Sequence, residues 1–449
     1  MKRIRVLTPL ILLAVSLCGP AAAQEKVTLT LEDSIRLALK QNPFYLANQA
    51  REDQATASVK EAYAGFFPTL NVQGTDVLDK KVFTIEFPSM IPGQPPTKVK
   101  FDFTRTYTFA FNFSLPVYTG GRLVSGYKSA KFNLDATREA VRQSREETVL
   151  NVKKGFYGYL LARSFVSVAE EGVTLAEKHY TNVKNLYDVG MASKFDLLRS
   201  EVQLSNLKPQ LIRARNAVAT AEIGLKMLLG LDLAQPVEFK GELTFQDVEA
   251  NVDANIAEAL TRRPEINQIQ YQTLMAAEMV KLNRGAGLPT VAIGGAYNYW
   301  SNLLNLKSSS WEDYYQINLV LNVPIFNGFS TSAKVAQAKA ALHQLEYSRK
   351  GLIESVKFEV QEAVLALRQA RESLQSQEKN VEQAQEAVRI AELNYSEGLA
   401  TNLDVSSAQV ALSQAKTNRV QALYDYAVAL AQIEKSVGKG SDRYAEEAK

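Results

Sequence analysis

The sequence has 449 residues, with 51 Lys and Arg, 48 Asp and Glu, and one cysteine, Cys18. Residues 1–23 read as a secretory signal peptide, because three basic residues precede the apolar stretch Leu7–Leu17 and the small residues Ala21–Ala23. Cleavage there leaves 48 basic residues against 48 acidic ones, so net charge gives no reason to expect nucleic acid as a partner.

The single cysteine and the hydropathy of the chain further limit the classes of protein to which it could belong. Cys18 would leave with the signal peptide, so the mature chain is expected to form no disulfide. A bulky Leu17 before Cys18 disfavours a lipoprotein signal. No later stretch offers the roughly 18–20 apolar residues of a membrane helix, so any crossing of a membrane would use strands.

A helix at about residues 31–66 is the first element predicted for the mature chain. Acidic and hydroxyl residues open it, Pro43 interrupts it locally and Pro68 stops it. Strands are predicted at about residues 69–78 and 106–115, where the hydropathy period changes from 3.6 to two.

The second strand has an unbroken apolar face formed by alternate residues, Tyr107, Phe109, Phe111, Phe113 and Leu115. Such a strand fits either a half-buried soluble sheet or an outer-membrane strand, and the signal peptide favours the latter. The proline-rich residues 79–105 between the strands are predicted to be an external loop, as are their shorter counterparts at 301–313.

Two helices complete the first half of the chain, one at about residues 121–187 and a returning one at about 196–230. At a rise of 1.5 Å per residue the longer helix is about 100 Å long. The apolar positions of both keep the seven-residue spacing of coiled coils. The irregular residues 231–254 are predicted to form a belt-like connection.

The same order of elements then occurs a second time. Leu115–Gly230 aligns without a gap to Val323–Gly438, an offset of 208 positions, so residues 24–230 and 255–438 are predicted to be two structural repeats. The second repeat is expected to contain helices at about 256–285, 329–395 and 404–437 and strands at about 290–300 and 314–323. Residues 439–449 are predicted to be a polar tail.

The returning helices are too short to cover the long helices on which they pack. The helices at 31–66 and 256–285 have close to the missing length, so each is expected to stack end to end with a returning helix. Each half would then be a long helix with a two-part antiparallel partner.

Each long helix ends in a duplicated turn, Tyr187–Asp196 and Tyr395–Asp404. Both turns contain a glycine that can close a helix in the left-handed conformation. Three residues later a hydroxyl residue can cap the next helix, and an aspartate a further three residues on can complete a capping box. The sequence therefore predicts two helical hairpin tips.

Four strands in one chain cannot close a barrel, and an open sheet edge in lipid leaves backbone groups unpaired. Two chains would supply eight strands, whose interior is filled by side chains, whereas three chains would supply twelve and leave a lumen. We therefore expect a trimer.

The duplicated layout and the paired Tyr-x-x-Gly-(Leu/Met)-Ala-(Ser/Thr)-x-x-Asp tips resemble the TolC family of outer-membrane channels over essentially the whole mature chain. The resemblance implies a mixed α and β membrane protein: a homotrimer with a twelve-stranded barrel in the outer membrane, continued by a twelve-helix tunnel in the periplasm. It also implies docking through the tips to a periplasmic adaptor and an inner-membrane transporter, as the exit duct of an efflux pump or a type I secretion system.

The resemblance implies two groups of site residues. A periplasmic gate is expected at Asp196, Asp404, Tyr187 and Tyr395, although the aspartates could serve only as helix caps. The family's gate arginine and second acidic ring are replaced here by Ala400 and Ser407, so hydrogen bonds and packing are expected to close the entrance, with the Tyr395 hydroxyl donating to Asp196 on a neighbouring hairpin.

Adaptor docking is expected at the two apices. The first comprises Val189, Gly190, Met191 and Ala192, and the second comprises Gly398, Leu399 and Ala400. Ordinary tight turns would explain the glycines, but exposed apolar apex residues favour an interaction site.

The sequence contains no nucleophile–base motif or phosphate-binding glycine loop, so no enzymatic activity and no cofactor are expected. Its two histidines, His179 and His343, lie far apart in heptad regions, with no metal-ligand spacing around them. A structural or adhesive coiled-coil protein anchored by its barrel is the alternative function, and the duplicated tips argue against it.

Overall fold

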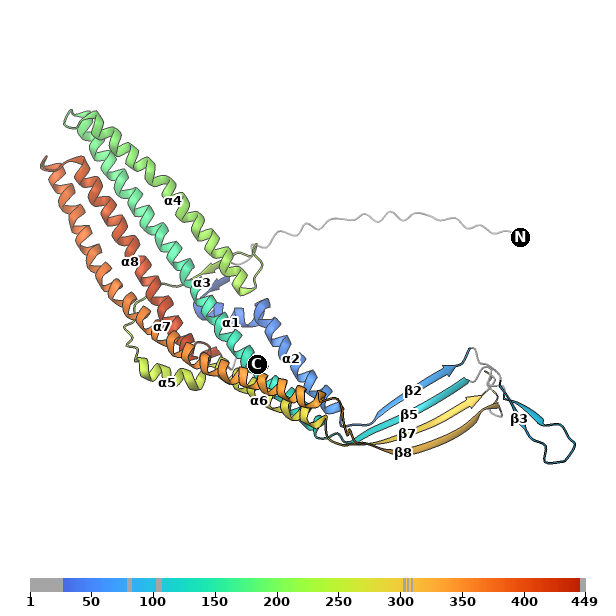
Figure 1. Ribbon diagram of the computed structural model, residues 1–449. Helices are drawn as coiled ribbons and strands as arrows, with labels where there is room; N and C mark the ends of the chain where they lie inside the picture. The colour runs from blue at the N-terminus through green and yellow to red at the C-terminus, as the bar shows by residue number, and fades with distance from the viewer. Residues whose placement is uncertain are drawn as a thin grey trace, which may run out of the picture.

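The computed structural model describes residues 27–444 except 79–82, 102–106, 302–303, 305–306 and 308–309. The chain is elongated, with two helical hairpins at one end and a four-stranded sheet at the other (Figure 1). The predicted signal peptide lies outside the described residues. Within the described chain, no helix has both the length and the apolar character needed to cross a membrane.

The first half contains the helices α1 (Leu31–Gln41), α2 (Pro43–Ala64), α3 (Arg122–Asp188) and α4 (Lys194–Leu229). The predicted helix at 31–66 is thus two helices separated at Asn42. Pro43 has no N–H to donate and occupies the first position of α2, where that donor is not needed. The Asn42 side chain caps the break, accepting from the N–H groups of Phe44 and Tyr45.

The second half contains α5 (Val252–Arg262), α6 (Pro264–Gly285), α7 (Ser330–Ser396) and α8 (Asn402–Val437). The prediction of one helix at 256–285 was wrong, because Pro264 opens a new helix as Pro43 does. The first of the two also begins earlier, since Asn251 caps it within the predicted connection. The long helices α3 and α7 both have 67 residues, and α4 and α8 both have 36.

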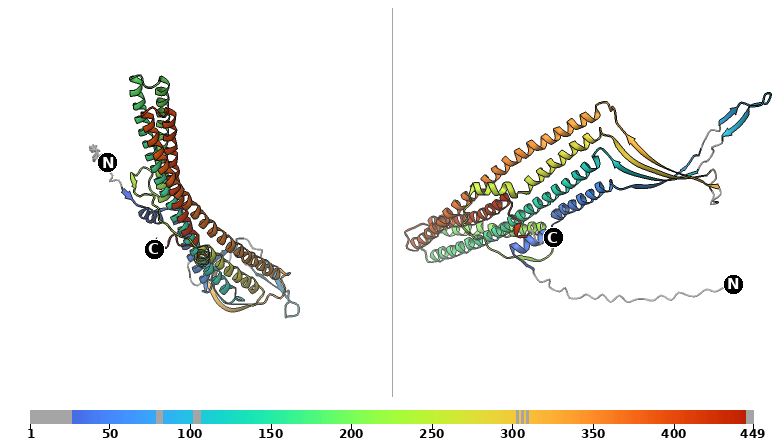
Figure 2. Two further views of the ribbon diagram at one scale, coloured as in Figure 1. Left: turned by 90° about the vertical axis from the view of Figure 1, so that its left-hand side faces the viewer. Right: turned by 90° about the horizontal axis from the view of Figure 1, so that it is seen from below.

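The main sheet consists of β2 (Thr69–Asp76), β5 (Tyr107–Tyr118), β7 (Thr290–Ser301) and β8 (Glu312–Asn322). The strands are antiparallel and lie in the order β2-β5-β7-β8, so β2 and β8 are the two edges. The helices α2, α3, α6 and α7 lie side by side and run into the strands β2, β5, β7 and β8, respectively (Figure 2).

The predicted loop at 79–105 contains a two-stranded hairpin, which the sequence reading missed. Its strands are β3 (Phe83–Phe87) and β4 (Thr97–Phe101), with Lys98 paired to Glu86 at 2.5 Å. Each strand has only five residues and four prolines lie between them, so the alternation is too short to stand out as a strand signal.

The returning helices stack end to end with the short helices along the long ones. α4 ends at Gly230 in the left-handed conformation, where a Cβ would lie 2.5 Å from the carbonyl oxygen of Gln41 at the end of α1. The Asn42 amide donates to the carbonyl of Leu228 across this joint at 2.7 Å. α8 ends in the same way at Gly438, where an added Cβ would lie 3.3 Å from the carbonyl carbon of Arg262.

The second joint is ionic. The guanidinium of Arg263 is 4% exposed and donates to Glu265 at 2.8 Å and to Glu359 of α7 at 2.6 Å. Lys435, near the end of α8, donates to the other oxygen of Glu359 at 2.9 Å. Burial alone would raise the pKa of Glu359, but the hydrogen bonds from Lys435 and Arg263 outweigh it and hold that pKa below its ordinary value.

The residues around the middle of α3 form a waist that joins both ends of the described chain. β1 (Val27–Leu29) pairs in parallel with β6 (Val237–Phe239), a strand within the predicted connection that the sequence reading missed. The ring of Phe239 packs edge to face against Phe156 of α3, at 6.1 Å between centroids. Leu29 and Tyr444 belong to the same apolar cluster.

The start of the predicted polar tail is packed against the waist. Ser441 is fully buried, and its N–H and hydroxyl both donate to the carboxylate of Glu146 on α3, at 3.1 and 2.6 Å. Burial raises the pKa of Glu146, although the hydrogen bonds from Ser441 oppose the rise. The tail therefore contributes to the core through a short 3₁₀ turn, Asp442–Tyr444.

Candidate functional site

The two hairpin tips have the same backbone geometry. After α3, Gly190 adopts φ 80° and the N–H of Met191 donates to the carbonyl of Leu186 at 2.7 Å. After α7, Gly398 adopts φ 73° and the N–H of Leu399 donates to the carbonyl of Asn394 at 2.8 Å. This six-to-one bond across a left-handed glycine is the Schellman motif, which satisfies the last carbonyls of a helix.

The apices present apolar side chains to the surroundings. Met191 and Leu399 are each 78% exposed and Val189 is 69% exposed, whereas Ala192 and Ala400 are half-buried. A Cβ placed on Gly190 or Gly398 would meet no atom within 4 Å, so the turns are open on their outer side. The residues expected to dock an adaptor therefore form two small exposed apolar apices.

The caps that begin the returning helices differ. Thr401 and Asp404 form a complete capping box, in which the Asp404 carboxylate accepts from the N–H and hydroxyl of Thr401 at 2.8 and 2.7 Å. These bonds lower the pKa of Asp404 below its ordinary value. Ser193 caps α4, and its hydroxyl donates to the Asp196 carboxylate at 2.5 Å, but the return bond to the Ser193 backbone is missing.

The four residues expected to form the gate are not gathered in one chain. Tyr395 lies near Asp196, and burial first and the Asp196 charge second raise the pKa of its hydroxyl. Within the described chain the expected hydrogen bond between them is not formed, and the Tyr395 ring instead packs edge to face on His179 at 5.5 Å. Tyr187 and Asp404 are exposed.

A buried polar cluster lies just behind the tips, and the sequence reading did not identify it. His179 of α3 and Asn402 of α8 are 5% and 2% exposed, and the His179 Nε2 lies 2.9 Å from the Asn402 Oδ1. The Asn402 amide donates to the backbone carbonyl of Asp196 on α4 at 2.8 Å. With Tyr395 from α7, all four helices of the two hairpins meet here. We refer to His179, Asn402, Tyr395 and the Asp196 carbonyl as the tip hub.

The sequence gives no distinct signal for this hub, because the two halves of the chain share a pattern and few identical residues. The position equivalent to His179 in the second repeat is Ala387, and the position equivalent to Asn402 in the first is Lys194. Most other aligned positions also carry different residues, so these two differences do not stand out. Spacing alone could not reveal that these two side chains meet.

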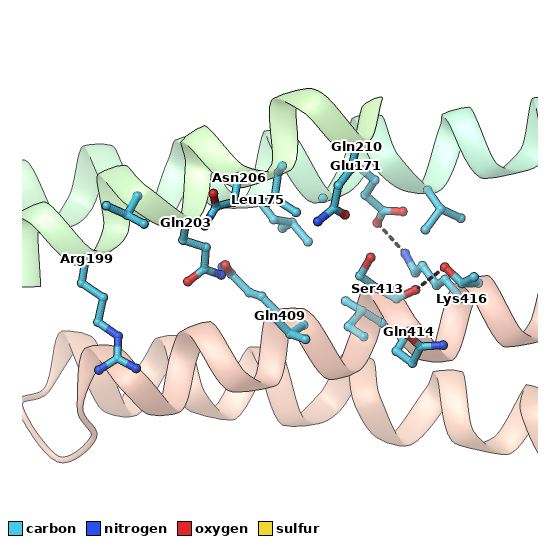
Figure 3. Close-up of a pocket in the computed structure, with 17 residues that line it drawn as sticks. Glu171, Leu175, Arg199, Gln203, Asn206, Gln210, Gln409, Ser413, Gln414 and Lys416 are labelled. Carbon is cyan, nitrogen blue, oxygen red and sulfur yellow. Dashed lines mark hydrogen bonds and ion pairs between the residues drawn. The ribbon is translucent and has the colours of Figure 1, made fainter. Parts of the chain in front are cut away.

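A groove of about 700 Å³ separates the hairpins further from the tips (Figure 3). It is lined by α3, α4 and α8, and Lys416 of α8 crosses it to Glu171 of α3 at 2.5 Å. The amide of Gln409 donates to Glu392 at 3.2 Å. Among the described residues, no three His, Cys, Asp or Glu side chains lie close enough together to hold a metal ion.

Known proteins share this architecture. The solved outer-membrane channel CmeC of Campylobacter jejuni superposes with a TM-score of 0.78 over 93% of this chain and 89% of its own, at 17% identity. Long helical hairpins joined to a four-stranded sheet are thus the fold of an outer-membrane channel subunit.

The sequence comparisons identify the family. The family described as "Outer membrane efflux protein" matches residues 34–231 and 255–439. The chain therefore belongs to this family of outer-membrane proteins. The outer membrane protein TolC of Vibrio cholerae is 21% identical over 431 residues, which cover 90% of each chain. The alkaline protease secretion protein AprF of Pseudomonas aeruginosa is 24% identical over 307 residues, covering 66% of this chain and 62% of that protein. The description of the family thus refers to efflux, and the name of one relative refers to secretion.

Proposed function

We propose that three copies of this chain form a passive exit duct in the outer membrane for a tripartite efflux pump or a type I secretion system. The sheets of the three copies would form a twelve-stranded barrel, and the hairpins would form a tunnel of helices in the periplasm. The tips would dock to an adaptor protein and, through it, to an inner-membrane transporter. The duct performs no catalysis of its own.

The observation that carries the proposal is that the chain has two open lateral edges along its whole length. One edge consists of β2, α2 and α4, and the other consists of β8 and α7. Every residue of β2 and β8 is exposed, and among the described residues each of these strands is hydrogen-bonded to a strand on one side only. An edge strand has unpaired backbone N–H and C=O groups that can bond to another strand. Strand β8 of one copy could pair with β2 of another copy in this way.

The two edge helices carry matching apolar stripes. On α4 the large exposed apolar residues recur at helical spacing on the face away from α3: Phe195, Leu198, Ile212, Ile223 and Met227. On α7 they recur on the face opposite its buried residues: Tyr347, Phe358, Leu365, Ile390 and Leu393. One stripe packed on the other would extend the contact between copies from the sheet to the tips.

A matched pair of substitutions tests the assembly. Ile223→Asp places a charge on the α4 stripe, where burial of an unpaired charge costs several kcal/mol, so the trimer should weaken by at least about tenfold. Val410→Asp is the control, because Val410 is equally apolar and 60% exposed but lines the groove within one chain. Mass measurement in detergent should give trimers for the parent and Val410→Asp. A parent that is monomeric yet forms conducting channels would refute the proposal.

Docking is tested separately at the second apex. Leu399→Asp adds a charge at an exposed position, so it should abolish export while the trimer and its membrane insertion remain intact. Lys194→Asp, a charge change at an exposed position beside the first tip, controls for altered surface charge. Unchanged export by Leu399→Asp would show that the apices are only turns.

A further inference from the structure

The turn from β8 into α7 contains a strained aromatic residue. Phe329 adopts φ 65°, and it is the only residue other than glycine with a positive φ among those that the structure describes. The equivalent residue before α3 is Gly121, at φ 79°. A Cβ in this conformation lies close to the following carbonyl oxygen, and such strain persists mainly at functional positions.

Contacts within the chain do not explain why a phenylalanine occupies this position. The ring of Phe329 packs edge to face on Phe326 at 5.3 Å between centroids, and both side chains are 74% exposed. Both lie on the open edge formed by β8 and α7 (Figure 2). The reason for the strained aromatic residue is therefore expected on a neighbouring molecule.

A joint inside the chain shows how this edge would meet its neighbour. α2 and α6 both have 22 residues and both begin with a proline, so their last residues, Ala64 and Gly285, are equivalent. α6 packs against α3, whereas the corresponding side of α2 is the open edge. Because α7 is equivalent to α3, the joint between α6 and α3 predicts how α2 of one copy meets α7 of the next.

The joint inside the chain is a close contact between backbones. A Cβ added to Gly285 would lie 2.5 Å from the carbonyl oxygen of Gly120, and one added to Gly120 would lie 2.9 Å from the Cβ of Leu288. The residue equivalent to Gly285 at the open edge is Ala64, which already has that Cβ. Helices α2 and α7 of neighbouring copies therefore cannot approach as closely as α6 and α3 do.

Larger side chains occur at the open edge, where the joint must be wider. Phe67 takes the place of Leu288, each directly before a proline, and Phe329 takes the place of Gly121. Phe67 is exposed, and its ring packs edge to face on Tyr63 at 5.2 Å between centroids. The increase in side-chain size on both edges matches the wider gap that Ala64 imposes.

The strand register adds Phe326 to the same contact. The equivalent residue in the first repeat, Tyr118, pairs with Val291 of β7. The residue equivalent to Val291 on β2 is Leu70, since each lies two residues after a proline, and Leu70 is exposed. Phe326 is therefore expected opposite Leu70 of the next copy.

We propose that Phe326 and Phe329 form an aromatic wedge that packs on residues 64–70 of a neighbouring copy and sets the spacing between copies where the sheet meets the helices. The inference rests on the proposed function as a trimeric duct. A second copy, rather than lipid, is the occupant, because lipid would not require the two edges to change size together.

Removal of the wedge should weaken the trimer. Phe329→Gly should make subunits exchange between trimers in detergent at least about tenfold faster, because it removes a buried aromatic contact. The turn should be retained, since Gly121 has the same conformation in the first repeat. Val410→Ala, which shortens an exposed side chain in the groove within one chain, should exchange at the parent rate. Exchange of Phe329→Gly at the parent rate would overturn the wedge.

A rescue variant tests whether size is what matters. Adding Ala64→Gly and Phe67→Leu to Phe329→Gly copies the residues of the joint inside the chain. The closer approach that glycine permits should return the exchange rate towards that of the parent. A triple variant that exchanges as fast as Phe329→Gly would contradict the role of the wedge as a spacer.

A disulfide tests the predicted register. Cβ atoms of directly opposite residues in antiparallel strands lie about 4.5–5.5 Å apart, so Phe326→Cys with Leu70→Cys should allow a bond. Within one chain β5 and β7 separate the two positions, so the bond can only link copies. Oxidation should give covalent dimers and trimers on a denaturing gel. Phe326→Cys with Asn71→Cys is the control, because Asn71 points to the other face of the strand.

These measurements separate the wedge from the duct. Thiols at positions 326 and 70 that stay unlinked in a stable trimer would assign the aromatic residues to the membrane and overturn the wedge, and the duct would stand. A parent protein that forms no conducting trimer would instead overturn the proposed function.

Discussion

The returning helices α4 and α8 have the same length and occupy equivalent places in the two repeats, yet their surroundings differ. α8 lies between α7 and α3, and Ser406 and Ala431 on it are 6% and 4% exposed. The equivalent positions of α4 are Leu198 and Ile223, which are 50% and 51% exposed. At these two pairs of positions, a small residue occurs where the chain encloses the helix and a large apolar one occurs where a neighbour is missing.

This contrast shows that helices at equivalent places in the two halves can have different neighbours. The long helices have equal lengths in the two halves, and so do the returning helices. The side chains of α8 are nevertheless suited to contacts within the chain, and those of α4 to the surface that we assign to a second copy. Substitutions at equivalent positions of the two helices should therefore have unequal effects.

The largest difference is expected at one equivalent pair, Tyr426 and Val218. Tyr426 is 1% exposed, and its hydroxyl donates to the carbonyl of Gln246 at 2.5 Å, whereas Val218 is only partly buried. Tyr426→Ala should lower the free energy of unfolding by about 3–5 kcal/mol and Val218→Ala by about 1 kcal/mol. Denaturant unfolding followed by circular dichroism measures both, and equal losses would contradict the contrast.

A smaller difference is expected between the two helix joints as the pH falls. The pKa of Glu359 is lower in the folded chain than in the unfolded one, so its contribution is present above the ordinary value and is lost as the pH falls below about 4.5. The joint at Gly438 should therefore loosen in acid before the joint at Gly230, which the neutral Asn42 amide closes.

Hydrogen exchange, corrected for the intrinsic effect of pH, would report each joint separately. Glu359→Gln should loosen the Gly438 joint at neutral pH by about 1.5–3 kcal/mol, because it removes a charged hydrogen-bond partner of Arg263 and Lys435. Asn42→Asp provides the opposite test, since it makes the other joint titratable. Loss of protection at both joints at the same pH in the parent would refute the distinction.

The smallest difference is expected at the helix caps. Thr401→Ala removes the hydroxyl of a complete capping box and should destabilise the start of α8 by about 1 kcal/mol. Ser193→Ala should cost roughly half as much at α4, because the reciprocal bond is already missing there. Hydrogen exchange in the first turn of each helix compares them, and a larger effect at Ser193 would reverse the order.

The sequence predicted what depends on local pattern. The long helices, the alternation in the four strands and the glycine turns all follow from spacing within a short window, and the end-to-end stacking followed from helix lengths. The break at Pro264 could have been read from its equivalence to Pro43 and was missed. The three-residue strand at Val237–Phe239 was too short for any period to show.

The tip hub and the packed tail could not be predicted in this way. Asn402 meets His179 only because α3 and α8 pack in one particular register, and no spacing along the chain encodes that register. In the sequence Glu146 is one of many charged residues on a long helix. Its carboxylate accepts from Ser441, which lies 295 residues later in the chain, and no local pattern indicates that contact.

The waist has a consequence for how the protein is made. Strand β1, near the start of the described chain, pairs with residues more than 200 positions later, and Tyr444 joins the same cluster from the other end. Contacts between such distant segments form late, because loop closure must precede them. A chain that emerges with its N-terminus first cannot form all contacts of the waist until nearly all of it has emerged. Until then the long helices lack part of their packing and are exposed to chaperones and proteases.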